Sequence, residues 1–294
     1  MAGTAELARR FRSPAAAQRF AAAYAELAAR WPQPLTRLDI GGEFGTTHVL
    51  ACGPPGGPPV VLLPGRGATA AVWFATARAL SRTRRVYGVD PVGDAGLSVA
   101  AGRAARRPQD LADWLDGVLG ELGLDSVALC GHSYGSWLAL SYALRQPGRV
   151  TRLALLDPTD CFAGLGLAYR LRAVPVLLRP GERRSRALIG WETGGRRDLD
   201  EAALTVHALS GEFRGPRIVL PKRPAAARLA TLAMPVLVLV AQRSRSHHPA
   251  AIAAKAREVL PAGARVVTLA GAAHHSVPAN DHAELNRELA GFLA

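Results

Sequence analysis

The stretch that decides the fold is residues 126–137, which reads SVALCGHSYGSW. It runs from a short apolar strand, through a Gly-x-Ser-x-Gly pentapeptide, into a helix. Because Gly131 and Gly135 lack side chains, the strand and the helix can approach each other closely around a sharp turn. The pattern therefore predicts a nucleophile elbow, with Ser133 lifted above the edge of a sheet.

A serine hydroxyl is a weak nucleophile without help, so this interpretation requires three further groups. A histidine must take the serine proton, a carboxylate must orient that histidine, and backbone N–H groups must point at the developing oxyanion. The pentapeptide alone is a weak signal, and the surrounding sequence has to supply these partners.

Strands and helices alternate on both sides of the elbow, which is typical of an α/β domain. A hairpin is expected at 35–52, joined by Gly41 and Gly42 at a sheet edge. Other short apolar segments read as strands, at 59–63, 85–90, 150–156, 235–241 and 265–269. The periodicity of large apolar residues predicts helices at about 4–30, 72–80, 108–122, 134–147 and 250–260, and at the C-terminal end.

The turn after the strand at 59–63 reads Pro64-Gly65-Arg66-Gly67. Glycines at the carboxyl end of a parallel strand allow a backbone N–H to point into the crevice where ligands bind. We therefore assign the N–H of Arg66 to an oxyanion hole, with the N–H of Tyr134 as its partner. The alternative is an ordinary tight turn with a solvated guanidinium.

The chain has 294 residues and a formal net charge of +13, which suits one large domain with an insertion. Such a charge often indicates a nucleic acid or an anionic membrane as partner. Here the basic residues are almost all arginine, and they are scattered in twos and threes along the chain. GC-rich codon usage explains this pattern better, so no nucleic-acid partner is expected.

The three cysteines, Cys52, Cys130 and Cys161, have unrelated spacings, which argues against a disulfide framework and against a metal cluster. The first thirty residues contain no apolar signal core, and the longest apolar runs are far shorter than a bilayer span. A cytoplasmic protein without a membrane span is expected.

Together these segments resemble the α/β-hydrolase fold, in its cap-bearing branch of serine esterases and lipases. The resemblance covers nearly the whole chain and rests on four pieces: the turn at 63–67, the loop at 90–98, the elbow at 131–135, and Gly271-Ala272-Ala273-His274. It implies a mostly parallel central sheet of about eight strands flanked by helices, with an inserted helical cap. The usual histidine before the oxyanion glycine is Pro64 here.

The resemblance also implies a domain organisation. Residues 1–34 form an N-terminal helical extension, and residues 35–160 form the first part of the hydrolase core. Between 161 and 232 the alternation of strands and helices breaks down, as expected of a cap inserted over Ser133. Residues 233–294 complete the core.

The position of the acid departs from the common pattern of the family. In most members it follows the strand equivalent to 236–240, but here that turn reads Ala241-Gln242-Arg243-Ser244 and holds no carboxylate. Some members place the acid one strand earlier, where Asp157 stands. The order Ser133, Asp157, His274 keeps the family's sequence of nucleophile, acid and histidine. A turn or helix cap before Pro158 is the structural alternative for Asp157, and Asp160 is the second candidate for the acid.

The remaining histidines are assigned structural roles. The Gly-x-x-His register selects His274 rather than His275, which reads as a polar loop residue. His132 is interpreted as a structural residue of the elbow, and His247 and His248 as parts of a solvated loop without metal-site spacing.

The resulting hypothesis is a serine hydrolase that cleaves the ester bond of a small-molecule acyl substrate without a cofactor or metal. Trp191 and Phe213 are expected to line its acyl pocket. The alternatives are a ligand-binding or vestigial protein of the same fold, or a cofactor-free perhydrolase, thioesterase or lyase on the same residues. An epoxide hydrolase or dehalogenase is disfavoured, because those enzymes carry an aspartate where Ser133 stands. The oligomeric state is left open.

Overall fold

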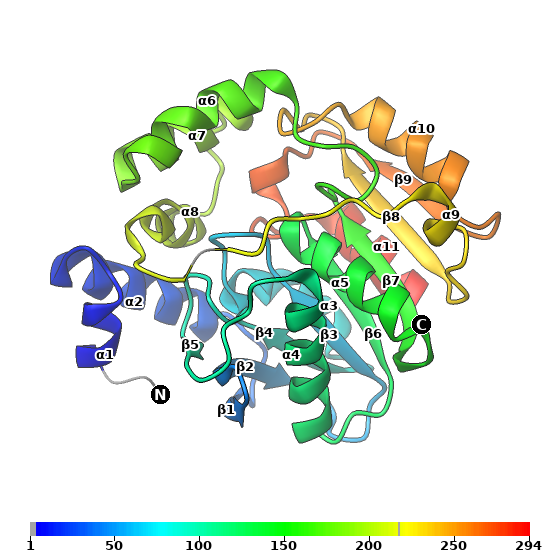
Figure 1. Cartoon of the computed structure of the whole chain (residues 1–294), viewed down its shortest axis with the longest axis horizontal. Helices are drawn as coiled ribbons and strands as arrows, with labels where there is room; N and C mark the ends of the chain where they lie inside the picture. Colours follow the sequence, from blue (N-terminus) through cyan, green and yellow to red (C-terminus); the bar gives the residue numbers. More distant parts are fainter. Residues whose placement is uncertain (1–3, 217) are drawn as a thin grey trace.

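A computed structural model describes residues 4–216 and 218–294. Within these residues the centre of the molecule is a nine-stranded sheet of order β1-β2-β4-β3-β6-β7-β8-β9, with β5 paired to β2 (Figure 1). From β4 to β9 all neighbours are parallel, whereas β1, β2 and β5 are joined by antiparallel pairing. The strands are β1 Thr36–Gly42, β2 Gly45–Cys52, β3 Pro59–Leu63, β4 Arg85–Val89, β5 Val99–Ala100, β6 Val127–His132, β7 Val150–Leu156, β8 Val236–Ala241 and β9 Arg265–Leu269.

Helices cover both faces of the sheet (Figure 1). Their bounds are α1 Thr4–Arg9, α2 Pro14–Ala29, α3 Phe74–Leu80, α4 Pro108–Glu121, α5 Tyr134–Arg145, α6 Leu167–Leu178, α7 Glu182–Glu192, α8 Glu201–Leu209, α9 Ala226–Leu229, α10 Pro249–Val259 and α11 Ala283–Leu293. Apolar residues of α2, α3, α8 and α11 form one core against the sheet, and those of α4, α5 and α10 form a second core on its other face.

The two cores explain why the central strands read as unbroken apolar runs. In β3, Val60 and Leu62 belong to one core, and Val61 and Leu63 belong to the other. Successive side chains of a strand point to opposite faces, so a strand covered on both sides is apolar at every position. The predicted fold class, a mostly parallel sheet flanked by helices, is confirmed.

Two details differ from the sequence-based expectation. The sheet has nine strands rather than about eight, because the two-residue strand β5 is too short to leave a pattern. The prediction of a single helix at 4–30 is wrong, because the helix is interrupted between α1 and α2. Ser13 accepts a hydrogen bond from the N–H of Ala16 at 3.1 Å, and Pro14 follows it at the first helical position. This pair is a signal for the start of a helix, and the sequence analysis passed over it.

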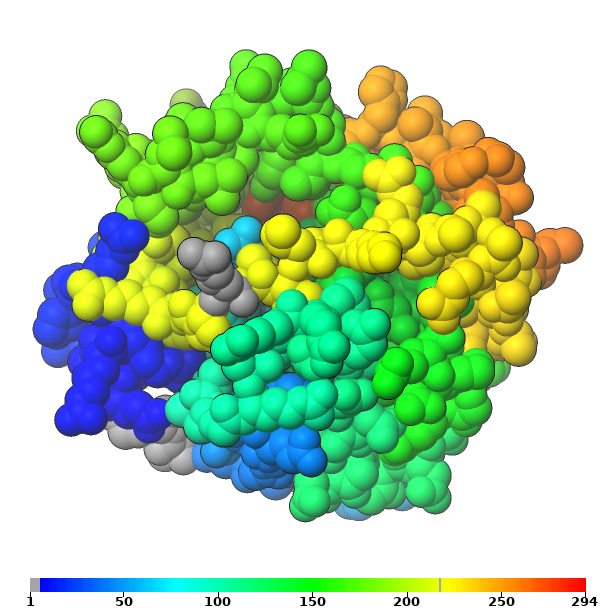
Figure 2. Space-filling view, viewed as in Figure 1, coloured from blue at the N-terminus to red at the C-terminus, as the bar shows by residue number. Residues whose placement is uncertain are grey.

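Helices α6 to α9 lie between β7 and β8 in the chain, and α6, α7 and α8 stand over the carboxyl ends of the parallel strands (Figure 1). The N-terminal helix α2 packs against α8, and Arg19 of α2 forms an ion pair with Glu182 of α7 at 2.7 Å. A space-filling view shows a hollow beneath these helices (Figure 2). The segment between β7 and β8 is called the cap below, and its limits at residues 161 and 232 stay a prediction.

Among the described residues, none of the helices combines the length and the apolar character needed to cross a membrane.

Candidate active site

The elbow lies between β6, which ends at His132, and α5, which begins at Tyr134. Ser133 alone forms the turn, at φ 53° and ψ −116°, a conformation that is rare for a residue with a side chain. A Cβ atom on Gly131 would lie 2.2 Å from the carbonyl oxygen of Gly135. A Cβ atom on Gly135 would lie 2.2 Å from the carbonyl oxygen of Leu63. Only glycines permit this contact, and the contact sets the position of Ser133.

The three residues proposed as nucleophile, base and acid meet in one hydrogen-bonded chain. Nε2 of His274 lies 2.9 Å from Oγ of Ser133, and Nδ1 of His274 lies 2.6 Å from Oδ2 of Asp157. Ser133, His274 and Asp157 are all buried. They come from the ends of β6 and β7 and from the loop after β9, at the carboxyl edge of the sheet.

Asp157 is held as an ionised group. Its Oδ1 accepts a hydrogen bond from the N–H of Ala241 at 2.8 Å and lies 3.2 Å from Nε2 of His247. Burial raises the pKa of Asp157, but His247 and His274 outweigh this effect and hold the pKa well below its usual range. Burial lowers the pKa of His274, but the hydrogen bond and charge of Asp157 outweigh it and raise the pKa above the ordinary imidazole value.

The expectation for His247 was wrong, whereas His248 is exposed as expected. His247 is buried against Asp157, because the loop after β8 folds back over the carboxylate and is tied to the cap. That tie is a hydrogen bond from the N–H of Gly166 to the carbonyl oxygen of Ser246, at 2.8 Å. The ligand atoms of Asp157, His247 and His274 lie within 4.8 Å of one another. In this arrangement Nδ1 of His274 is already engaged in its hydrogen bond to the carboxylate.

Neither Asp160, the second candidate for the acid, nor the turn at Ser244 takes part in this chain of hydrogen bonds. Ser244 is buried and brings no charge to the site. The backbone N–H of Asp160 donates to the carbonyl oxygen of Ala163, and within the described part of the chain its carboxylate makes no contact with His274. The ring of His132 packs beside that of His274, with the ring centroids 4.8 Å apart.

The turn after β3 lies over Ser133. A Cβ atom on Gly65 would lie 3.2 Å from Cβ of Ser133, so the backbone of this turn borders the nucleophile. Within the described residues, the backbone N–H groups of Arg66 and Tyr134 have no acceptor. Two free N–H groups beside a buried serine are the donors that an oxyanion needs.

Two aspartates after β4, the buried Asp90 and the half-buried Asp94, hold this turn in place, and the sequence analysis assigned them no role. Asp94 accepts a hydrogen bond from the N–H of Gly67 at 2.9 Å, and Asp90 accepts one from the N–H of Ala70 at 2.7 Å. Burial raises the pKa of both carboxyls. The sequence feature that could have indicated this role was the loop at 90–98, because it follows the end of β4 next to the turn at 64–67.

Glu192, the last residue of α7, was also missed. It is completely buried, and Oε1 accepts hydrogen bonds from the N–H groups of Arg245 at 2.9 Å and His274 at 3.1 Å. Oε2 accepts one from the N–H of His275 at 3.1 Å and lies 3.0 Å from Nδ1 of the same residue. Burial raises the pKa of Glu192, but the hydrogen bond and charge of His275 outweigh it, and the pKa is lowered to about 2.

A negative charge in the last turn of a helix interacts unfavourably with the helix dipole, so a glutamate is unusual at this position. This was the one feature of the sequence that could have drawn attention to Glu192. Its carboxylate joins the cap to the loop that carries His274. His275 therefore takes part in the site through Glu192 rather than through Ser133.

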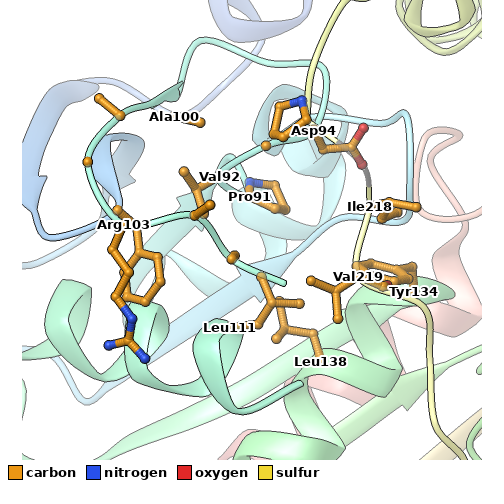
Figure 3. Close-up of a pocket in the computed structure, with 17 residues that line it drawn as sticks. Pro91, Val92, Asp94, Ala100, Arg103, Leu111, Tyr134, Leu138, Ile218 and Val219 are labelled. Atoms are coloured by element: carbon orange, nitrogen blue, oxygen red, sulfur yellow. The ribbon is translucent and has the colours of Figure 1, made fainter. Parts of the chain in front are cut away.

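A cavity of about 240 Å³ is lined in part by Tyr134, which follows Ser133 in the chain, whereas Ser133 itself is not among the described lining residues (Figure 3). Its wall is mainly apolar and includes Pro91, Val92, Leu111, Tyr134, Leu138 and Val219. Trp191 and Phe213, which the sequence analysis expected in an acyl pocket, do not line this cavity. Trp191 packs near Tyr169, with ring centroids 6.4 Å apart, and Phe213 packs on Phe11 at 5.6 Å.

Comparisons with known proteins agree with this architecture. The family model for the α/β hydrolase fold matches residues 58–187. Carboxylesterase YbfK of Bacillus subtilis is 32% identical over 181 residues, which cover 62% of this chain and 60% of the relative. An uncharacterised carboxylesterase, nap, of the same organism is 34% identical over 144 residues, which cover 49% of this chain and 48% of the relative. These alignments thus span about half to three fifths of the curated relatives.

Solved structures extend the similarity over the whole fold. The crystal structure of the Bacillus subtilis carboxylesterase CesB (YbfK) superposes with a TM-score of 0.87 at 25% identity, covering 95% of this chain and 99% of that one. The structure of naproxen esterase from the same organism gives a TM-score of 0.87 at 23% identity, with 95% and 98% covered. The chain therefore has the α/β-hydrolase fold and is similar to these carboxylesterases.

Proposed function

We propose that this protein is a serine carboxylesterase that hydrolyses small-molecule esters through an acyl-enzyme intermediate. The observation that carries the proposal is the hydrogen-bonded chain from Ser133 through His274 to Asp157. A serine next to a base, with the base oriented by a third group, is the arrangement that activates a hydroxyl. The similarity to carboxylesterase YbfK supports the choice of an ester as substrate.

Acylation would begin when Oγ of Ser133 attacks the ester carbonyl and its proton passes to Nε2 of His274. The negative charge on the carbonyl oxygen is met by the N–H groups of Arg66 and Tyr134. Asp157 stabilises the imidazolium that forms, and Nε2 then returns the proton to the leaving alkoxide. The alcohol departs, and the acyl group stays on Ser133.

Deacylation repeats these steps with water as nucleophile. His274 takes a proton from the water, the hydroxide attacks the acyl carbonyl, and the proton returns to Oγ of Ser133. Each step uses only water and the side chains and N–H groups of this chain, so no cofactor or metal enters the mechanism.

The apolar cavity beside Tyr134 suits an uncharged, apolar group of the substrate. Three buried, unpaired cysteines are compatible with a cytoplasmic location.

Replacing the nucleophile tests the proposal directly. Ser133→Ala should reduce turnover of p-nitrophenyl butyrate to the background rate, because Ser133 carries the one hydroxyl among the described residues that is hydrogen-bonded to His274. Ser126→Ala, in the loop before the same strand, is the matched control and should keep full activity. Turnover by Ser133→Ala comparable with that of the parent would mean that another group attacks the ester.

The acid is tested by a second pair of variants. Asp157→Asn should lower kcat by about 10²–10⁴, since the amide leaves the geometry intact but cannot stabilise an imidazolium. Ser244→Ala should leave kcat nearly unchanged. Stopped-flow or steady-state kinetics on the same ester give both values, and a loss confined to Ser244→Ala would contradict the assignment.

The same variant has a predicted effect on pH dependence. His274 must be neutral to accept a proton, so kcat/KM should fall as the pH drops through its raised pKa. Asp157→Asn removes the group that raises this pKa, and the acid limb of the residual activity should move to lower pH.

Glu192 is expected to act as a positioning residue for His274. Glu192→Gln keeps the size of the side chain but turns an N–H₂ group toward the N–H of one histidine, and a misplaced base costs up to about a hundredfold. We expect kcat to fall by about tenfold to a hundredfold with little change in KM. The acid limb should also move to lower pH, because the charge of Glu192 raises the pKa of His274.

Glu201→Gln, an exposed position on the same cap, is the control and should behave as the parent. A lowered melting temperature for Glu192→Gln without a change in kcat or in the pH profile would give Glu192 a structural role only.

A further inference from the structure

Helix α6 carries most of the exposed large apolar side chains of the described residues. Leu167, Leu171, Leu177 and Leu178 are each 62% to 76% exposed, and Val174 is 42% exposed. Outside α6, Leu220 alone joins this group among the described residues. No residue of α6 is buried. A patch of this kind on one helix is unusual for a protein surface and indicates an interaction.

The exposed residues form one continuous row. Leu167, Leu171, Val174 and Leu178 are spaced at i, i+4, i+7 and i+11, which places them on a single face of the helix. Half-buried Tyr169 stands on the opposite face, and its ring lies 6.4 Å from that of Trp191 in α7. The apolar row therefore faces away from Trp191 and is exposed. The helix itself lies at the outer edge of the molecule, away from the sheet (Figure 1).

Exposed arginines accompany this row. Arg170 lies on one side of it and Arg179 on the other by helical spacing, and Arg183 and Arg184 follow at the start of α7. Arg172 is turned toward α7, where its guanidinium lies 4.4 Å from the centroid of the Trp191 ring. None of the five has an ion-pair partner in the part of the chain that the structure describes. The acid between them, Glu182, is already paired with Arg19 and Arg186.

The charge of the cap segment agrees with this local picture. Residues 161–232 contain thirteen basic and six acidic side chains, a net charge of +7, which is more than half of the +13 of the whole chain. The sequence analysis discounted an anionic membrane because the basic residues looked scattered. The structure places four of them, Arg170, Arg179, Arg183 and Arg184, on or directly after the helix that carries the apolar row.

We propose that α6 docks on the surface of an anionic lipid bilayer, with its apolar row in the interface and its arginines against the headgroups. The helix has 12 residues and a length of about 18 Å, too short to cross a hydrocarbon core of about 30 Å, so it lies in the plane of the surface. An apolar stripe flanked by arginines is the pattern of an interfacial helix. A second copy of the chain fits this face less well, because face-to-face association would bring two unpaired arginine rows together.

The docking is tested with the full chain and vesicles of phosphatidylcholine, with and without phosphatidylglycerol. The protein should sediment with the anionic vesicles at low salt, remain in solution with the zwitterionic ones, and be released by salt as the charges are screened. Leu171→Ser/Leu178→Ser and Arg170→Glu/Arg179→Glu should each weaken binding by at least about tenfold.

The matched control for charge is Arg78→Glu/Arg82→Glu, two exposed positions on the core that make the same change in net charge. This control should keep most of the binding, and all three variants should hydrolyse a water-soluble ester like the parent, since none touches the site around Ser133. Unchanged hydrolysis also separates this test from that of the proposed function.

Three results would overturn the proposal. One is the absence of binding to anionic vesicles at low salt. Another is an equal loss of binding in the control and in the α6 charge variant, which would show that only overall charge matters. The third is a concentration-dependent dimer in sedimentation analysis that Leu171→Ser/Leu178→Ser abolishes, which would assign the face to a second copy.

Discussion

The structure depends on the close contact of β6, α5 and β3 at the elbow. Gly131 and Gly135 have no room for a Cβ atom, because backbone oxygens already lie within 2.2 Å of where each would stand. This contact forces Ser133 into its unusual backbone conformation at the end of the strand. The groups around the serine come from other strand ends at the same edge of the sheet: the turn at Arg66 follows β3, Asp157 follows β7 and His274 follows β9.

The position of Asp157, the proposed acid, shows how neighbouring strand ends can bring the same groups together from different places in the chain. With Ser244 in place of a carboxylate after β8, Asp157 reaches His274 from the adjacent parallel strand, and Ala241 donates its N–H to that same carboxylate. His247 fills the space on the other side of Asp157. Glu192 adds a second buried carboxylate. It accepts hydrogen bonds from the backbone N–H groups of His274 and His275 rather than from the ring of His274. The cap and the histidine loop are thus one connected unit.

The sequence was sufficient for those features that local chemistry dictates. Apolar runs such as 59–63 predicted the buried strands, and the Gly-x-Ser-x-Gly pattern predicted the turn at Ser133. The roles of Glu192 and His247 depend on contacts across more than fifty residues of chain, and no local pattern encodes them. The spacing of Leu167, Leu171, Val174 and Leu178 is a local pattern, but whether that helix face is buried or exposed depends on how α6 packs against α7.

The most direct test of the account is covalent labelling of the native protein with a fluorophosphonate, followed by peptide mapping. Phosphonylation needs a serine activated by a neighbouring base, and only then does the reagent react quickly. The account predicts one label per chain, on the peptide that contains Ser133, and no rapid labelling of His274→Ala. Absence of labelling in the native protein, or a label on another serine, would contradict the claim that Ser133, His274 and Asp157 form a working catalytic unit.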